Sequence, residues 1–324
     1  MPLKVGVVSA AHVHAPSFVA CFMAEPDAEV VGVWDDDAAR GEAFAAARGL
    51  AFEPDLSALL SRVDAVVICS ENLKHGDHIQ AAAEAGVHIL CEKPIAPTQA
   101  IAAQIKEALK NSSKVFMTAF PCPFSPTFER MQKVIQAGEI GKVLALSTTN
   151  RGMCPMSWFV ESDKSGGGAM VDHVVHVGDL LRRLIGQSPN SVYAQIGSNM
   201  YGKDWEDTAC LTLGFPNGVF ATLDSSWSRP QGYKIWGDVT LKAVGEKGVV
   251  EADLFGQGVE LTHSGHAIAG TGSNLDRAMV REFLDAITEN RQPRCTLEDG
   301  LRASMIAEAG YRSLKEGRAV APVG

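Results

Sequence analysis

The sequence predicts an α/β protein with two domains: a doubly wound parallel sheet, then an α+β domain whose large sheet is mostly antiparallel. Three observations lead to this prediction. The chain has 324 residues, and a domain usually contains roughly 100–200. Its first 120 residues alternate short apolar runs with alanine-rich helical stretches, as α/β folds do. From residue 192 onward, strand patterns follow one another with only turns between them. We therefore divide the chain into domains at 1–120 and 121–324.

The first domain is predicted to contain five parallel strands. Near-continuous runs of valine and isoleucine are typical of strands buried on both faces of a sheet. Such runs predict strands at residues 4–9, 29–34, 65–69, 88–90 and 115–119. Helical patterns predict the intervening helices at 16–24, 37–48, 56–61, 77–85 and 98–109. Right-handed crossovers wind such helices onto both faces of the sheet.

The second domain begins with helices and continues as a sheet. A helix is predicted at 128–137, ending at Gly138, and the glycines 166–168 open another that runs to Leu184. Strands are predicted at 192–196, 208–215, 219–227, 238–244 and 249–252. Two helices, 275–289 and 297–315, close the chain, and Gly317 suits the capping position after the second.

Composition argues against two classes of partner. Lys and Arg number 29 against 38 Asp and Glu, a net charge of −9, whereas nucleic-acid binding rests on clustered cations. No apolar run reaches the ~18 residues needed to cross a bilayer, so no membrane partner is expected. The residues at the start of the sequence do not show the pattern of a secretory signal peptide, and the seven cysteines form no CxxC pair. We therefore expect a cytoplasmic protein.

The turn after the first strand is where a Rossmann-type sheet binds the pyrophosphate of a dinucleotide, because N–H groups and the helix dipole favour the anion. It reads Ser9-Ala10-Ala11-His12-Val13-His14, so the glycines of a GxGxxG motif are absent at 9, 11 and 14. We predict that loop N–H groups still hold the pyrophosphate, with His12 nearer the cofactor than His14. The alternative is that both histidines cap or pack the turn. A metal on these two is not expected, since no further ligand lies nearby in sequence.

An acidic cluster ends the second strand. Asp35 lies 26 positions after Ser9 (35 − 9), which suits hydrogen bonds from the ribose hydroxyls of the adenosine. A carboxylate there repels the 2′-phosphate of NADP, so the predicted cofactor is NAD, with NADP less favoured. Asp36 and Asp37 are expected to cap the following helix.

Two further segments lie at the carboxyl ends of strands, where open α/β sheets bind ligands. Ser70, Asn72 and His75 follow the strand predicted at 65–69, and Glu92-Lys93-Pro94 follows that at 88–90. A lysine fixed there by the following proline is well placed for chemistry. In a generic protein, the same Lys-Pro pair marks a surface turn.

The segment from Gly166 to Asp179 holds the densest polar cluster of the second domain. On a helix, Asp172, His176 and Asp179 are spaced i, i+4 and i+7 and share a face. An imidazole between two carboxylates suits a general base. The alternative is a capped helix with a buried structural histidine. His173 is expected to point off this face, and a metal site on Asp172, His173 and His176 is only weakly indicated.

Together these motifs resemble the glucose–fructose oxidoreductase and inositol dehydrogenase (Gfo/Idh/MocA) family over nearly the whole chain. Glu92-Lys93-Pro94 resembles the family's EKP signature, and Asn72 with His75 resembles its motif near the cofactor. The stretch 166–179 resembles the GGGAxxDxGxHxxD segment, and 296–318 resembles the family's end. The resemblance implies that Lys93, Asp172 and His176 are catalytic.

The resemblance also implies an NAD-dependent oxidoreductase that transfers a hydride between nicotinamide and a sugar, cyclitol or related polyol. His176 takes the hydroxyl proton in this interpretation, while Lys93 holds the developing alkoxide and Asp172 supports the pair. The candidate cofactor-binding residues are Ser9, Ala10, Ala11, His12, Val13, Asp35, Ser70, Asn72, His75, Glu92 and Lys93. The candidate substrate residues are Lys93, Arg151, Trp158, Lys164, Asp172 and His176. A face of the C-terminal sheet suits a homodimer or homotetramer.

Departures from the family pattern keep two other functions open. The loop glycines are absent, Val174 replaces a glycine of the helix motif, and Pro123 stands where the family often has arginine. The missing glycines are compatible with a family member that has lost cofactor chemistry and acts as a ligand-binding or regulatory protein. A metal-dependent hydrolase or lyase using His173 and His176 is the third interpretation.

Overall fold

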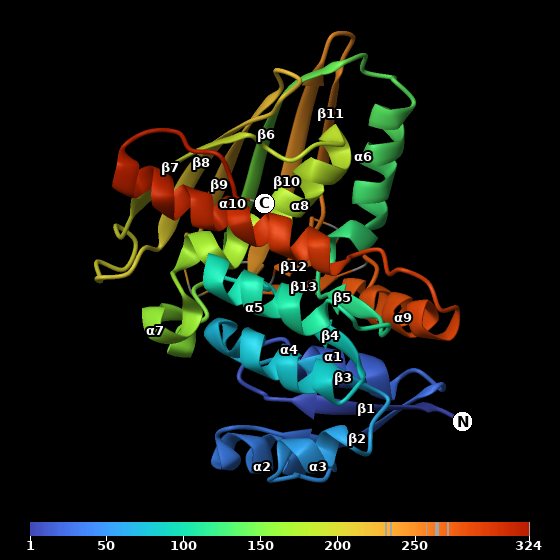
Figure 1. Ribbon diagram of the computed structural model, residues 1–324. Helices are drawn as coiled ribbons and strands as arrows, with labels where there is room; N and C mark the ends of the chain where they lie inside the picture. Colours follow the sequence, from blue (N-terminus) through green and yellow to red (C-terminus); the bar gives the residue numbers. More distant parts are fainter. Residues whose placement is uncertain (231, 234, 257, 263–265, 271, 324) are drawn as a thin grey trace. The chain divides into compact units, whose positions relative to one another are not determined.

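In the computed structural model, the N-terminal part of the chain forms a five-stranded parallel sheet in the order β2-β1-β3-β4-β5 (Figure 1). The strands are β1 (Leu3–Val8), β2 (Ala28–Trp34), β3 (Ala65–Ile68), β4 (His88–Cys91) and β5 (Phe116–Thr118). All five begin and end within one residue of the predicted bounds, so the parallel sheet is confirmed. The structure describes residues 1–230, 232–233, 235–256, 258–262, 266–270 and 272–323.

Helices alternate with these strands. They are α1 (Ala15–Met23), α2 (Ala38–Ala46), α3 (Leu56–Leu60), α4 (His75–Glu84) and α5 (Gln99–Leu109). Asp37, Asp55 and Thr98 begin three of them, because each side chain accepts a backbone N–H of the first turn. A later helix, α9 (Leu275–Thr288), packs against α1, and the rings of Phe22 and Phe283 lie 6.3 Å apart.

β1 is the turning point of the parallel sheet, because its neighbours are β2 on one side and β3 on the other. From β1 the chain first adds β2 on one side, and it then crosses over to add β3, β4 and β5 on the other side. Because both crossovers are right-handed, the helices in them lie on opposite faces of the sheet. The carboxyl ends of β1 and β3 therefore border the crevice where doubly wound sheets bind ligands.

The C-terminal part forms a six-stranded sheet in the order β11-β10-β6-β9-β8-β7. Its strands are β6 (Val143–Gly152), β7 (Ser191–Gly197), β8 (Thr208–Gly214), β9 (Phe220–Ser226), β10 (Gly237–Gly245) and β11 (Val249–Asp253). Of these pairings, β6 with β9 is parallel and the rest are antiparallel. The mostly antiparallel sheet is therefore confirmed. A separate two-stranded sheet, β12 (Gly258–Thr262) with β13 (His266–Gly270), is not among the predicted elements.

β6 is an inner strand of the larger sheet and is also absent from the predicted strands. Its five successive polar residues, 147–151, interrupt the apolar pattern that marks a buried strand. In the fold these groups find partners. The Thr148 hydroxyl donates to the carbonyl of Thr222 at 2.8 Å, and the Asn150 amide donates to the carbonyl of Asp238 at 3.1 Å. Buried polar groups that are paired in this way are tolerated inside a sheet.

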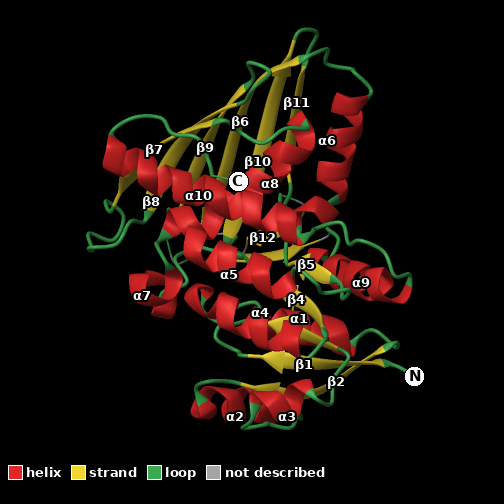
Figure 2. Cartoon of the chain, in the orientation of Figure 1, coloured by secondary structure: helices red, strands yellow, loops and turns green. Residues whose placement is uncertain are grey.

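Two helices, α8 (Ala169–Ile185) and α10 (Leu297–Glu316), cover one face of the six-stranded sheet (Figure 2). Helix α6 (Pro126–Gln136) packs beside α8, and the short α7 (Ser162–Ser165) precedes α8 in the sequence. Alternate strand residues such as Ala194, Leu211 and Leu223 are buried on this face. The residues between them point the other way, and Tyr193 and Phe220 are 40% and 53% exposed. The unit therefore has one covered and one open sheet face.

The chain divides into two compact units, and the division differs from the predicted boundary in one respect. One unit is Met1–Pro121 with Leu275–Leu301, and the other is Cys122–Asn274 with Arg302–Gly324. The first break lies after Pro121. The predicted domain 121–324 is interrupted, however, because α9 packs on α1. Helical periodicity in a sequence does not say which sheet a helix joins.

Among the described residues, no helix combines the length and apolar character that crossing a membrane requires.

Candidate active site

The loop after β1 turns tightly at Ser9. Its backbone φ is 64°, a left-handed conformation that non-glycine residues rarely adopt, at the position of the first glycine in a GxGxxG motif. The N–H groups of Ala10, Ala11 and His12 already donate within the protein, at 2.7, 3.3 and 2.9 Å. The turn thus has the shape of a dinucleotide loop but offers a pyrophosphate fewer backbone donors.

Asp35, at the end of β2, holds this loop in place. Its buried carboxylate accepts the N–H groups of Ala10 and Asp37 at 2.7 and 2.9 Å. It also accepts Nη2 and Nε of Arg40 at 2.6 and 2.9 Å. Asp37 caps α2 as predicted, accepting the Arg40 N–H at 3.1 Å. Arg40 is not among the predicted site residues, and its only sequence signal is its place three residues after that cap.

Asp36 joins a charge network instead of the predicted helix cap, because two cations lie within reach of its carboxylate. It pairs with Lys74 and with Arg40, and each of these cations also binds Glu71 at 3.1 Å. Burial alone raises the pKa of Glu71, but a backbone hydrogen bond and the charges of Arg40 and Lys74 hold that pKa below its usual value. The network ties the end of β2 to the turn after β3.

The Glu92-Lys93-Pro94 segment follows β4 and is buried, with Lys93 only 3% exposed and a cis peptide before Pro94. His75 Nδ1 lies 2.9 Å from the carbonyl oxygen of Pro94. Since a carbonyl only accepts, this nitrogen carries the proton. Burial lowers the pKa of His75 to about 4, so the ring is neutral at pH 7 and positions the segment that carries Lys93.

Ser70 and Asn72, the other residues predicted after β3, are buried. The Ser70 hydroxyl lies 2.9 Å from Nδ1 of His78. Asn72 begins a short 3₁₀ turn, Asn72–Lys74, that leads into α4. Both residues lie at the carboxyl end of β3, between β1 and β4 in the sheet.

His12, His14 and Glu92 come together although 78 residues separate His14 from Glu92. Nδ1 of His14 and of His12 lie 2.9 and 3.3 Å from Oε1 of Glu92. Burial alone raises the pKa of Glu92, but the charges of the two histidines and a hydrogen bond from His14 lower it to about 2. Burial alone lowers the pKa of His14, and Glu92 raises it above its usual value. Sequence spacing gave no sign of this cluster.

The glycines before α8 allow close contacts at the start of that helix. A Cβ on Gly167 would lie 2.1 Å from the hydroxyl oxygen of Tyr311, and one on Gly168 would lie 2.2 Å from the carbonyl oxygen of Glu206. The Gly168 N–H donates to the Glu206 carboxylate at 2.6 Å. Larger residues would displace the first turn of α8, which carries Asp172.

Asp172 and His176 are both buried and lie one turn apart on α8. Asp172 accepts Trp227 Nε1 at 3.0 Å. His173 also contacts it, with Nε2 at 3.3 Å from Oδ2. His173 Nδ1 lies 2.9 Å from the carbonyl of Asn150. Both ring nitrogens of His173 thus face acceptors. The prediction that His173 stands apart was wrong, because its side chain reaches back over the preceding residue.

Asp179, the second acid predicted on this face, has partners on its own helix. Arg183 Nε donates to it at 2.6 Å and Arg182 Nη2 at 3.4 Å. These bonds place cations near the carboxyl end of α8, where the helix dipole favours them. Asp179 therefore anchors the end of the helix, whereas Asp172 belongs to the candidate site.

Arg151, Trp158 and Lys164 lie in the second unit, as predicted. Arg151, on β6, binds Asp238 of β10 at 2.9 and 3.0 Å. Trp158 is buried and stacks on Phe159, with ring centroids 3.9 Å apart. Lys164 pairs with an acid three residues earlier. Each has a structural role in its unit, and contact with a substrate stays a prediction.

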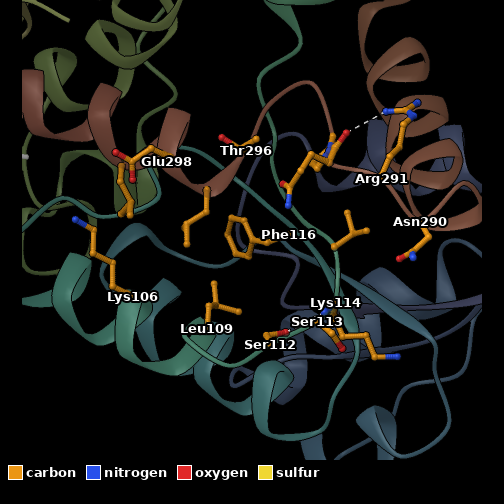
Figure 3. A pocket seen from close by; sticks show the side chains of 15 residues that line it. Lys106, Leu109, Ser112, Ser113, Lys114, Phe116, Asn290, Arg291, Thr296 and Glu298 are labelled. Atoms are coloured by element: carbon orange, nitrogen blue, oxygen red, sulfur yellow. Dashed lines mark hydrogen bonds between the residues drawn. The ribbon is translucent and has the colours of Figure 1, made fainter.

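A hollow of about 620 Å³ lies within the first unit, between the end of α5 and the segment around the start of α10 (Figure 3). Lys106, Arg291 and Thr296 contribute to its lining. Phe116, the first residue of β5, also lines it, so the hollow lies at the amino end of that strand. Ligands of doubly wound sheets bind at the carboxyl ends, so this hollow is not part of the candidate site.

Family models match both halves of the chain. Residues 3–120 match an oxidoreductase family with an NAD-binding Rossmann fold, and residues 128–251 match a GFO/IDH/MocA C-terminal domain. The chain belongs to the GFO/IDH/MocA family. The resemblance inferred from the motifs is thus confirmed, together with the NAD-dependent oxidoreductase activity and NAD as the cofactor.

Other GFO/IDH/MocA proteins are similar along most of the chain. Inositol 2-dehydrogenase of Rhizobium meliloti strain 1021 is 29% identical over 309 residues, which cover 91% of this chain and 92% of that protein. Myo-inositol 2-dehydrogenase of Thermotoga maritima is 26% identical over 273 residues, covering 80% and 79%. The crystal structure of GenD2 from gentamicin A biosynthesis, in complex with NAD, has a TM-score of 0.89 and 25% identity, covering 100% and 97%.

Proposed function

We propose that this oxidoreductase moves a hydride between NAD and a CH–OH carbon of a sugar, cyclitol or related polyol. The start of α8 carries the proposal, because buried Asp172 is held there by Trp227, and His176 follows one turn later. A carboxylate and an imidazole on one helix supply the orienting group and proton acceptor that alcohol oxidation needs. Two of the relatives described above are named inositol dehydrogenases, which supports a polyhydroxylated substrate.

The proton of the reacting hydroxyl needs an acceptor. Imidazole, with an unperturbed pKa of ~6.5, accepts at neutral pH, whereas lysine, at ~10.4, is already protonated. We therefore assign His176 as the principal base, Lys93 as the cation that stabilises the alkoxide, and Asp172 as the group that orients them. The nicotinamide supplies the hydride acceptor. A proton shared between Lys93 and His176 is the competing assignment.

The described residues of the first unit fit a dinucleotide. The left-handed turn at Ser9 follows β1, and buried Asp35 ends β2, where it is proposed to accept hydrogen bonds from the adenosine ribose. Because three loop N–H groups donate elsewhere, the His12 side chain and the N–H of exposed Val13 are proposed to hold the pyrophosphate. The other proposed cofactor contacts are Ala10, Ala11, Ser70, Asn72, His75, Glu92 and Lys93. Arg151, Trp158 and Lys164 are proposed to shape the substrate pocket.

We also propose that the protein works in the cytoplasm as a homodimer or homotetramer. The structure describes all seven cysteines and contains no disulfide among them, and five of them are buried, which supports a reducing compartment. The open face of the six-stranded sheet exposes apolar side chains, including Leu144, Tyr193 and Phe220. Such a face supports contact with a second copy.

The function is tested by NAD-dependent thermal stabilisation, then by a screen of polyols, and then by variants. His176→Ala is expected to lower kcat by about 10²–10⁴ while NAD affinity is retained.

Lys93→Met is expected to lower kcat and to weaken NAD binding. Asp172→Asn is expected to lower kcat by less than His176→Ala does. His88→Gln, at a histidine outside the proposed machinery, is the control.

Near-normal turnover and an unchanged pH profile in His176→Ala would remove His176 from the mechanism and leave Lys93 as the acid–base group. A chain that binds no NAD at all would favour the ligand-binding or regulatory alternative.

A further inference from the structure

Among the described residues, His12, His14 and Glu92 form a group whose potential ligand atoms all lie within 4.8 Å of one another. The Glu92 and His12 side chains are 0% and 1% exposed, whereas that of His14 is 30% exposed. Two elements supply the group, the loop after β1 and the residue after β4. It is therefore enclosed by the protein on most sides and open to solvent beside His14.

The contacts within the group bring its three side chains together at one carboxylate oxygen. Nδ1 of His12 lies 3.2 Å from the backbone nitrogen of His14. The same ring nitrogen lies 3.3 Å from Oε1 of Glu92. That oxygen is also 2.9 Å from Nδ1 of His14. Both histidine nitrogens thus converge on one buried carboxylate oxygen, and a cation bound by all three groups would replace these contacts with ligand bonds.

We propose that His12, His14 and Glu92 bind a divalent transition-metal ion, with Zn²⁺ as the representative. Two imidazoles and one carboxylate suit such ions better than Mg²⁺ or Ca²⁺, which prefer all-oxygen sites. Ligand bonds of about 2.0–2.2 Å put the ligand atoms of a tetrahedral site about 3.4 Å apart. The distances of 2.9 and 3.3 Å to Glu92 are near this value, so small side-chain movements are enough. The open side leaves a fourth position for water or an anion.

The surroundings of Glu92 resemble those of a supported metal ligand. Its second oxygen, Oε2, accepts the backbone N–H of Lys93 at 2.9 Å, which fixes the orientation of the carboxylate as outer hydrogen bonds do at metal sites. The cation would also lie in the turn whose N–H groups at Ala10, Ala11 and His12 donate elsewhere. The bound cation would supply positive charge in the loop where the backbone N–H groups of a dinucleotide-binding protein normally bind an anion.

The test uses the full chain, freed of metal with a chelator and without NAD, so that its outcome is separate from that of the proposed function. Titration with Zn²⁺ in a calorimeter is expected to show one equivalent bound. Co²⁺ in its place is expected to give the visible absorption of a four- or five-coordinate ion. X-ray absorption of the Zn²⁺-loaded wild type is expected to show nitrogen and oxygen neighbours, which requires no variant to fold.

Glu92→Gln keeps the shape of the side chain and removes its charge, and His14→Asn changes the most exposed ligand. Each is expected to weaken Zn²⁺ binding by at least about 10–100-fold, the loss typical even for groups that only support a ligand. His88→Gln, which alters a histidine elsewhere in the same unit, is expected to bind as the wild type does.

Three results would overturn the proposal: no stoichiometric uptake by the wild type, sulfur neighbours or thiolate absorption that assign the ion to cysteines, or unchanged affinity in both ligand variants.

Discussion

Arg40 is held by the carboxylate of Asp35 through two hydrogen bonds, and this pair lies where the adenosine ribose is proposed to bind. An arginine near this place is the group that accommodates the 2′-phosphate of NADP in related sheets. Asp35 therefore acts against NADP in two ways. Its own charge repels the phosphate, and it engages the guanidinium that would otherwise attract it.

We predict that the wild type binds NAD more tightly than NADP and that Asp35→Ser shifts the preference toward NADP by about tenfold or more, ~1.4 kcal/mol. Fluorescence titration with both cofactors measures the shift. Asp36→Ser is the matched control, because Asp36 also contacts Arg40 but leaves Asp35 in place. Tighter NADP binding by the wild type, unchanged in Asp35→Ser, would show that Asp35 does not set the preference.

The candidate catalytic residues were predicted where a motif is contiguous in the chain. Lys93 stands in a short run after a strand, and Asp172 and His176 lie on one helix, so local spacing identifies them. Their partners come from elsewhere in the fold. Trp227 reaches Asp172 across 55 positions, and no pattern in the sequence links the two. Local patterns therefore identify chemical groups, and tertiary packing decides which groups meet.

Helix α9 shows how an element from late in the chain is fastened to the first sheet. Glu25, just after α1, is 6% exposed and accepts hydrogen bonds from Arg277 and Arg281 of α9 at 2.8 and 3.1 Å. Arg281 also binds Asp27 with two bonds of 2.8 Å. The hydrogen bond from Arg277 is the main cause that holds the pKa of Glu25 below its usual value.

Glu25→Gln is predicted to lower the Tm by about 2–4 °C at pH 7 and to matter less in acid. The folded-state pKa of Glu25 lies below the unfolded value of ~4.3, so its ionised form stabilises the fold above that pH. This contribution is lost as the pH falls through the folded-state pKa. Thermal unfolding from neutral to acidic pH measures the narrowing gap. Exposed Glu29→Gln is the control, and a gap that stays constant with pH would contradict the assignment.

The strands of the first sheet could be predicted because short, continuous apolar runs are typical of parallel strands that are buried on both faces. β6 could not, because its polar stretch is compatible with a strand only once the neighbouring β9 and β10 supply partners. For α9, periodicity indicated a helix correctly, but not the unit it joins. Element type is thus largely local information, whereas the assignment of an element to a core depends on the rest of the chain.

At the scale of the molecule, the open face of the six-stranded sheet exposes apolar side chains that the fold of one chain does not cover. Phe220 and Val249 are 53% and 51% exposed there, and Leu144 and Tyr193 are 45% and 40% exposed. Apolar side chains gathered on one sheet face mark an interaction surface more often than a solvated one. These four exposed apolar side chains therefore support the proposed homo-oligomer.

We predict that Phe220→Asp shifts the oligomer toward monomer, because the interface would then bury an unpaired charge. Light scattering after size-exclusion chromatography measures the mass. Met23→Asp, at an exposed apolar position of the first unit, is expected to leave the mass unchanged. A wild type that stays monomeric at every concentration would exclude this role for the sheet face.

The return of residues 275–301 to the first unit also bears on the order in which the chain folds as it leaves the ribosome. Translation delivers the five parallel strands first, but the face of α1 around Phe22 stays uncovered until α9 has emerged. By then every strand of the six-stranded sheet has been made, since β11 ends at Asp253. The unit whose synthesis begins first therefore stays incomplete until all strands of the second unit have been made, and a nascent chain stalled before residue 275 would still expose the apolar face that α9 covers.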